Sequence, residues 1–123
     1  MRKFISLLIL IVLSAIFFIG CKRIDNSNPN DMLLTAAQLG DIDRVRLAIA
    51  KGANLNYQDE NGGTALHWAV FYGYKDIVQL LLMHGADPLI KDKDGITPID
   101  VARINNKKEM LKLLEKYVKK KKE

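Results

Sequence analysis

The chain has 123 residues, of which 49% are hydrophobic and 27% are charged, and its formal net charge at pH 7 is +5. A single cysteine excludes an internal disulfide, and the two histidines lack the spacing of a metal site. The only serine after residue 20 is Ser27, which precedes the regular part of the sequence and excludes a serine nucleophile in a folded domain.

The first predicted element is an apolar segment at the N-terminus. A basic start at Arg2 and Lys3 precedes a nearly continuous apolar run that reaches Ile19, and Gly20 then comes before a polar stretch. This order is typical of a secretory signal peptide, which we predict over residues 1–20.

The residues around the only cysteine add a resemblance. The sequence Phe18-Ile19-Gly20-Cys21 resembles the lipobox of bacterial lipoproteins. The resemblance implies that Cys21 is lipidated and that the chain is anchored in a membrane of the bacterial cell envelope, facing the periplasm or the outside. Two alternatives stay open. The 17 residues from Phe4 to Gly20 are near the lower limit for an uncleaved N-terminal transmembrane anchor, and simple secretion is the other.

The next segment, residues 21–30, is polar and contains Pro29 and several asparagines. It has no apolar period, so we expect a flexible tether that reaches about 30 Å at most.

A period of 33 residues governs the rest of the chain. Three alanines follow it through the whole segment: Ala36, Ala69 and Ala102. A fixed period of this size predicts a stack of similar units, each too small to fold alone. Further pairs at this spacing are Gly40 and Gly73, Gly52 and Gly85, Gly62 and Gly95, and Thr64 and Thr97.

Local signals predict that each unit is a pair of helices. Thr64 and Thr97 are good N-cap residues, and Pro98 suits the first helical position. Asp100 lies three residues after Thr97, nearly as in a capping box. Glycine or asparagine ends each first helix, at Gly40, Gly73 and Asn106. The predicted fold class is therefore all-α.

The last second helix should close the stack. Its apolar residues form one stripe and charged residues cover the rest, which predicts a solvated cap. The lysine-rich tail, residues 118–123, is interpreted as a solvated helix end; contact with anionic lipid headgroups is the functional alternative.

These residues, above all Asp59 to Gly73 and their weaker copy from Asp92 to Ala102, resemble the ankyrin repeat family. The resemblance implies a solenoid of about three repeats over residues 31–117, divided at 31–58, 59–91 and 92–117, with β-turn finger loops at about a right angle to the helices. It also implies that His67 ties neighbouring loops together and that Trp68 lies in the core.

Function in this family is recognition of a protein partner in a concave groove. Mapping the family pattern onto the middle repeat gives contact positions at the finger tip, in the loop and at the helix end, including Gly63. Phe71 and Tyr72 are adjacent aromatics there, and the competing interpretation is that Phe71 packs internally on the next repeat. The predicted partner-binding residues are Leu39, Glu60, Asn61, Phe71, Tyr72, Lys91, Lys93, Asp94 and Ile104.

The sequence thus predicts a non-catalytic protein–protein interaction module that is lipid-anchored through Cys21 and monomeric. We expect no cofactor, no metal and no nucleic acid partner. The alternatives are an immunity or inhibitor protein against a secreted toxin or enzyme, a helper of an envelope enzyme, and a structural envelope component.

Overall fold

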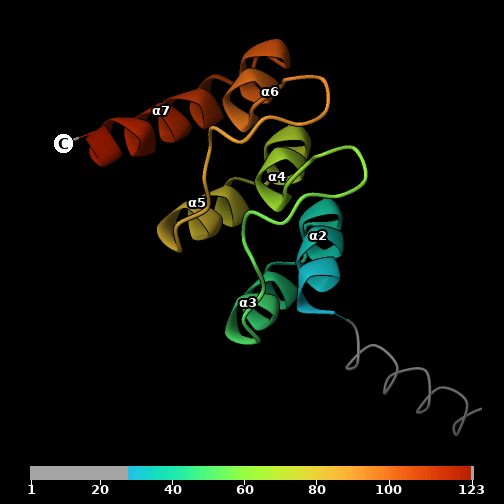
Figure 1. Ribbon diagram of the computed structural model, residues 1–123. Helices are drawn as coiled ribbons and strands as arrows, with labels where there is room; N and C mark the ends of the chain where they lie inside the picture. Colours follow the sequence, from blue (N-terminus) through green and yellow to red (C-terminus); the bar gives the residue numbers. More distant parts are fainter. Residues whose placement is uncertain (1–27, 123) are drawn as a thin grey trace, which may run out of the picture.

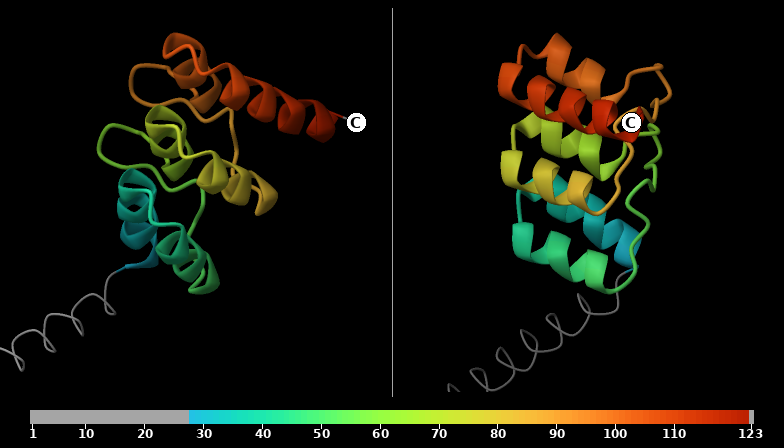
Figure 2. Two further views of the ribbon diagram at one scale, coloured as in Figure 1. Left: turned by 180° about the vertical axis from the view of Figure 1, so that it is seen from behind. Right: turned by 90° about the vertical axis from the view of Figure 1, so that its left-hand side faces the viewer.

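The computed structural model describes residues 28–122, and these residues form three pairs of helices without a strand. The helices pack in two layers (Figure 1). The inner layer stacks the first helix of each pair, and the outer layer stacks the second (Figure 2). The inner helices are α2 (Pro29–Leu39), α4 (Ala65–Tyr72) and α6 (Pro98–Ile104); the outer helices are α3 (Ile42–Ala50), α5 (Lys75–Met83) and α7 (Lys108–Lys122).

The three pairs repeat the same backbone device at the expected interval. The carbonyls of Ala36, Ala69 and Ala102 each accept a hydrogen bond from the backbone N–H five residues later, at 2.8 to 3.0 Å. Between helices the backbone turns through a positive φ, at Gly40 (74°), Gly73 (79°) and Asn106 (54°). Glycine and asparagine tolerate this conformation, so the predicted helix ends are confirmed.

The predicted helix starts are also confirmed. The Thr64 hydroxyl accepts from the His67 backbone N–H, and the Thr97 hydroxyl accepts from the Asp100 backbone N–H. The side chains of His67 and Asp100 each reach back to the N-cap N–H, which makes both ends full capping boxes.

The first helix begins earlier than the boundary expected at Asp31. Asn28 caps α2 by accepting from the backbone N–H of Asn30, and Pro29 occupies the first turn. The side chain of Asn30 also accepts from the backbone N–H of Asn54 at 2.7 Å. These residues, which look like a linker by composition, therefore belong to the folded stack.

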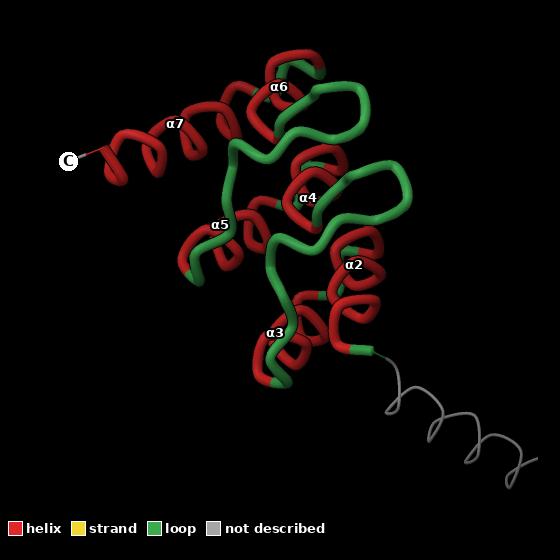
Figure 3. The backbone as a smooth tube through the Cα atoms, viewed as in Figure 1, coloured by secondary structure: helices red, strands yellow, loops and turns green. Residues whose placement is uncertain are grey.

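Two long loops project past the inner helices on one side of the molecule (Figure 3). Neighbouring loops are joined by backbone bonds, because Lys93 N–H donates to the Asn61 carbonyl at 3.0 Å. The Gln58 amide reinforces this by donating to the carbonyls of Gly62 and Lys91. The loops are thus held in register as one surface.

The core runs between the two layers. Its largest fully buried apolar side chains include Leu33, Leu66, Ile77, Leu81 and Leu114. The last helix, α7, continues to Lys122, so the lysine-rich segment is a helix end, as interpreted from the sequence, although the helix passes the repeat boundary expected at residue 117. The predicted cap stripe is confirmed at its centre, with Met110 and Leu114 buried.

The predicted signal peptide, the transmembrane alternative, Cys21 and most of the predicted tether lie outside the described residues. Within residues 28–122, none of the helices combines the length and the apolar character that crossing a membrane requires.

Candidate functional site

The structure exposes every one of the nine residues predicted to bind a partner. They fall into two groups along the inner layer. Leu39, Phe71, Tyr72 and Ile104 lie at or near the C-terminal ends of the three inner helices, whereas the loop residues lie toward their N-terminal ends. An eight-residue helix such as α4 separates the two groups by about 12 Å.

Gly63 is a correction to the expected contact positions, because it is buried. Its backbone N–H donates to the Asp59 carboxylate at 2.9 Å, and a side chain at this position would meet that carboxylate and the Trp68 indole. Gly63 therefore belongs to the turn and does not present a side chain to a partner.

Four aromatic rings form a continuous cluster at the end of α4. Phe71 and Tyr72 meet edge to face, with centroids 5.0 Å apart. Tyr72 also stacks on Trp68 and on Tyr74, at 6.1 and 5.8 Å. Phe71 and Tyr72 nevertheless keep 47% and 48% of their surface exposed. Internal packing of Phe71, the competing interpretation, is therefore at most partial.

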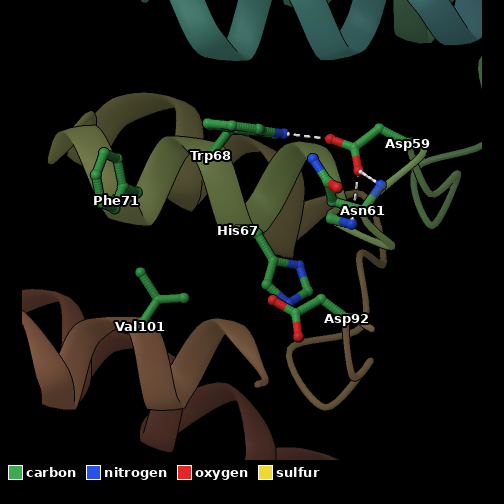
Figure 4. A pocket seen from close by; sticks show the side chains of 8 residues that line it. Asp59, Asn61, His67, Trp68, Phe71, Asp92 and Val101 are labelled. Atoms are coloured by element: carbon green, nitrogen blue, oxygen red, sulfur yellow. Dashed lines mark hydrogen bonds between the residues drawn. The ribbon is translucent and has the colours of Figure 1, made fainter. Parts of the chain in front are cut away.

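Trp68 lies closer to the surface than expected. It is half-buried and packs against the core. Its indole N–H donates to the Asp59 carboxylate at 2.8 Å (Figure 4). Because indole carries a single donor that must find a partner when buried, Asp59 fixes the ring at the base of the finger loop.

A hollow of about 300 Å³ opens beside these rings, between α4, α6 and the two finger loops (Figure 4). Its walls are mostly apolar. The hollow includes Asn61 and Phe71 from the predicted set but neither Leu39 nor Ile104. Its lining residues are Asp59, Asn61, Gly63, His67, Trp68, Phe71, Asp92 and Val101.

Sequence reasoning missed Val101 and the groove-facing side of Trp68. The two residues are 33 positions apart, so they occupy the same place in successive repeats. The structure brings both residues to the same hollow, because α4 and α6 are neighbours in the inner layer. The sequence could indicate that the two positions are equivalent, but not which side of α4 and α6 faces the hollow.

His67 has the role that the resemblance implied. Its Nδ1 accepts from the Thr64 N–H at 3.0 Å, and its Nε2 lies 2.8 Å from the carbonyl oxygen of Ile96 in the next loop. A backbone N–H can only donate, so the ring hydrogen lies on Nε2 and donates to Ile96.

The carboxylates near the hollow serve the turns. Asp59 and Asp92 each accept two backbone N–H groups of their own loop. The backbone N–H and then the hydroxyl of Thr97 hold the pKa of Asp100 below its ordinary value. Over the described residues, no group of three or more His, Cys, Asp or Glu side chains could hold a metal ion.

Comparison with known proteins agrees with this geometry. The family model described as "Ankyrin repeats (3 copies)" matches residues 7–92 and residues 33–123. The mimivirus protein named "Putative ankyrin repeat protein R664" (Acanthamoeba polyphaga mimivirus) is 34% identical over 120 residues, which cover 93% of this chain and 74% of that protein.

Other similar proteins are much longer than this chain. The human 2-5A-dependent ribonuclease is 49% identical over 76 residues, which cover 61% of this chain. The human BCL-6 corepressor-like protein 1 is 38% identical over 98 residues, which cover 78% of it. The chain spans only 10% of the ribonuclease and 6% of the corepressor-like protein.

Proposed function

Because this chain belongs to the ankyrin repeat family, we propose that it is a non-catalytic module that captures a partner protein on its inner face. The observation that carries the proposal is the half-exposure of Phe71 and Tyr72 beside an apolar hollow. The ribonuclease activity named for the human relative is not carried over, since the chain spans only a tenth of that protein.

The energetics favour a partner centred on these rings. Exposed neighbouring aromatic side chains keep apolar surface in contact with water, and a partner that covers them removes this surface from water. In protein interfaces, a few such anchors supply most of the binding energy. The hollow next to Phe71 is at the small end of ligand pockets and suits one or two apolar side chains of a partner. The finger tips, with Glu60, Lys93 and Asp94, supply charged groups of both signs for the rim.

Site-specific photocrosslinking in intact cells tests this proposal. A photoreactive residue at Asn61 or Lys93 should yield a discrete crosslinked product. The same residue at Gln79, which is exposed on outer helix α5, should not. The double variant Phe71→Ala/Tyr72→Ala should remove the product.

The matched control is Leu47→Ala/Met83→Ala, which removes two exposed apolar side chains from the outer helices α3 and α5. The aromatic variant should lose about 1–2 kcal/mol of folding stability through its ring contacts, well short of a core substitution. A product that survives the aromatic variant, or that forms equally from the outer face, would overturn the proposal.

We further propose that the chain is exported by the segment at residues 1–20 and lipidated at Cys21, in a bacterial cell envelope. The support is the sequence of that segment alone. Processing that is blocked by globomycin and by Cys21→Ser would support lipidation. Unchanged size and membrane retention under both treatments would favour the uncleaved transmembrane anchor.

A further inference from the structure

The last helix differs from its counterparts in length and in charge. α7 has 15 residues, whereas the equivalent outer helices α3 and α5 have nine each. The additional six residues extend α7 by about 9 Å past the length that the repeat uses (Figure 2). The extension is mostly lysine.

Five of the lysines in α7 share one face, which we call the lysine face. The first three follow one another at four-residue steps, and the last two lie three and four positions after the third, as residues on one side of a helix do. All of them are exposed: Lys108, Lys112, Lys116, Lys119 and Lys120. The buried residues Met110 and Leu114 lie on the opposite side, packed toward α5 and α6. The lysine face therefore points away from the stack.

This face keeps an excess of positive charge, because Glu115 is the one carboxylate among the residues that line a hollow with Lys112, Lys116, Lys119 and Lys120. Among the ion pairs within residues 28–122, the one that involves α7 joins Glu109 to Lys75, and the lysine face takes part in none. Lys108, Lys112, Lys116 and Lys120 instead follow one another at four-residue steps. Like charges at that spacing repel one another, and the negative end of the helix and Glu115, which lies among these lysines, offset this repulsion only in part.

We infer that the lysine face docks on an anionic lipid bilayer surface. Lysines in a row over about 18 Å match a plane of mobile headgroups, which needs charge complementarity but no fitted socket. The face carries neither arginine nor an aromatic ring, the side chains that read bases and stack on them, so nucleic acid fits less well. Docking there involves the outer layer and leaves the inner face free.

Lysine footprinting of the full chain tests the inference. The chain is incubated with vesicles of phosphatidylcholine containing 30% phosphatidylglycerol, or of phosphatidylcholine alone, and treated with an amine-reactive reagent. Anionic vesicles should protect the lysine face several-fold, and high salt should abolish the protection. Lys91 and Lys93, exposed on a finger loop, are the controls within the same molecule.

A binding series provides a second readout. Replacing Lys119 and Lys120 with Gln should weaken the preference for anionic over neutral vesicles by about fivefold for each lysine. Replacing Lys91 and Lys93 removes the same charge and should leave the preference unchanged. The preference is the ratio of the affinities for anionic and neutral vesicles. Insertion of the apolar N-terminal segment would contribute equally to both affinities and so does not change this ratio.

The inference would be overturned if anionic vesicles protected Lys91 and Lys93 as strongly as the lysine face. Protection of the lysine face that persists on neutral vesicles would also overturn it, as would protection by a duplex RNA but not by anionic vesicles. Circular dichroism of each variant shows whether helicity is retained. If a variant unfolds, the footprint on the unmodified chain still decides.

Discussion

The Nε2 atom of His67 lies 2.8 Å from the carbonyl oxygen of Ile96, although 29 residues separate the two along the chain. The same ring closes the capping box of α4 through Nδ1. One side chain therefore connects a helix start in the middle repeat to the finger loop of the next repeat.

Replacing His67 with Ala should destabilise the fold by roughly 2 kcal/mol, because it leaves the buried backbone N–H of Thr64 without an acceptor and removes the hydrogen bond to the Ile96 carbonyl, which keeps only the Asp92 N–H. Urea denaturation measures this. Faster amide exchange at Thr64 in the variant would locate the loss at the capping box. The control is His84→Ala, at an exposed helix end, which should change stability by less than about 0.5 kcal/mol. Equal effects of the two variants would contradict the role of His67 as a tie.

The contact between neighbouring finger loops predicts that Gly62→Ala is costly. Gly62 has a φ of +79°, and an added Cβ would lie 2.8 Å from the backbone nitrogen of Lys93. We expect a loss of about 2–4 kcal/mol, from the left-handed backbone and from forcing the two loops apart.

Gly85→Ala is the matched control for this substitution. Gly85 also has a positive φ, at +96°, but no atom within 4 Å of an added Cβ. The difference in urea midpoint between the two variants isolates the crowding of the loops. Equal urea midpoints of the two variants would mean that the close approach of the loops at Gly62 does not affect stability.

The 33-residue period predicted the helix pairs well because their ends are decided locally. Thr64, Thr97 and Gly73 act within one turn of their own position, so the sequence contains the whole cause. Asn28 and Pro29 act locally as well, but their composition is equally typical of a linker, and the early start of α2 was missed for that reason.

The sequence did not predict features that depend on contacts between side chains and backbone across a turn, or that lie where the sequence has no distinct apolar periodicity. α4 is apolar on nearly every side, so periodicity could not show that one side of Trp68 faces the hollow. The burial of Gly63 follows from the way the Asp59 side chain folds back over the turn. The lysine run has no apolar spacing, so the repeat was expected to end at Tyr117, whereas α7 continues to Lys122.

The two equivalent turn aspartates should differ in importance. Asp59 and Asp92 accept matching pairs of backbone N–H groups, but Asp59 also accepts from the Trp68 indole. Since a hydrogen bond to a charged acceptor contributes about 1.5–3 kcal/mol, Asp59→Ala should destabilise the fold by roughly 1.5 kcal/mol more than Asp92→Ala. Urea denaturation followed by circular dichroism measures both, and it also serves for variants that lack Trp68, the only tryptophan.

A double-mutant cycle assigns the difference to the indole contact. In Trp68→Phe, which keeps an apolar ring but no donor, replacing Asp59 with Ala should cost about as much as Asp92→Ala does in the native chain. An undiminished cost in the Trp68→Phe background would place the effect in the turn instead.

The capping carboxylate of α6 makes stability depend on pH in the acid range. Hydrogen bonds from Thr97 lower the pKa of Asp100 in the folded chain. A lowered folded pKa means that the contribution of the Asp100 carboxylate to stability is fully present above the unfolded pKa of about 4. It is lost as the pH falls through the folded pKa.

Asp100→Asn keeps an oxygen that can accept from the Thr97 N–H but has no charge. At pH 7 it should be about 0.5 kcal/mol less stable than the native chain, the usual effect of a carboxylate at a helix N-terminus. Urea denaturation from pH 7 to pH 2 should show this gap closing below pH ~4. Asp94→Asn, at an exposed loop tip, is the control with the same change of charge. A gap that stays constant down to pH 2 would mean that the charge of Asp100 does not stabilise the cap.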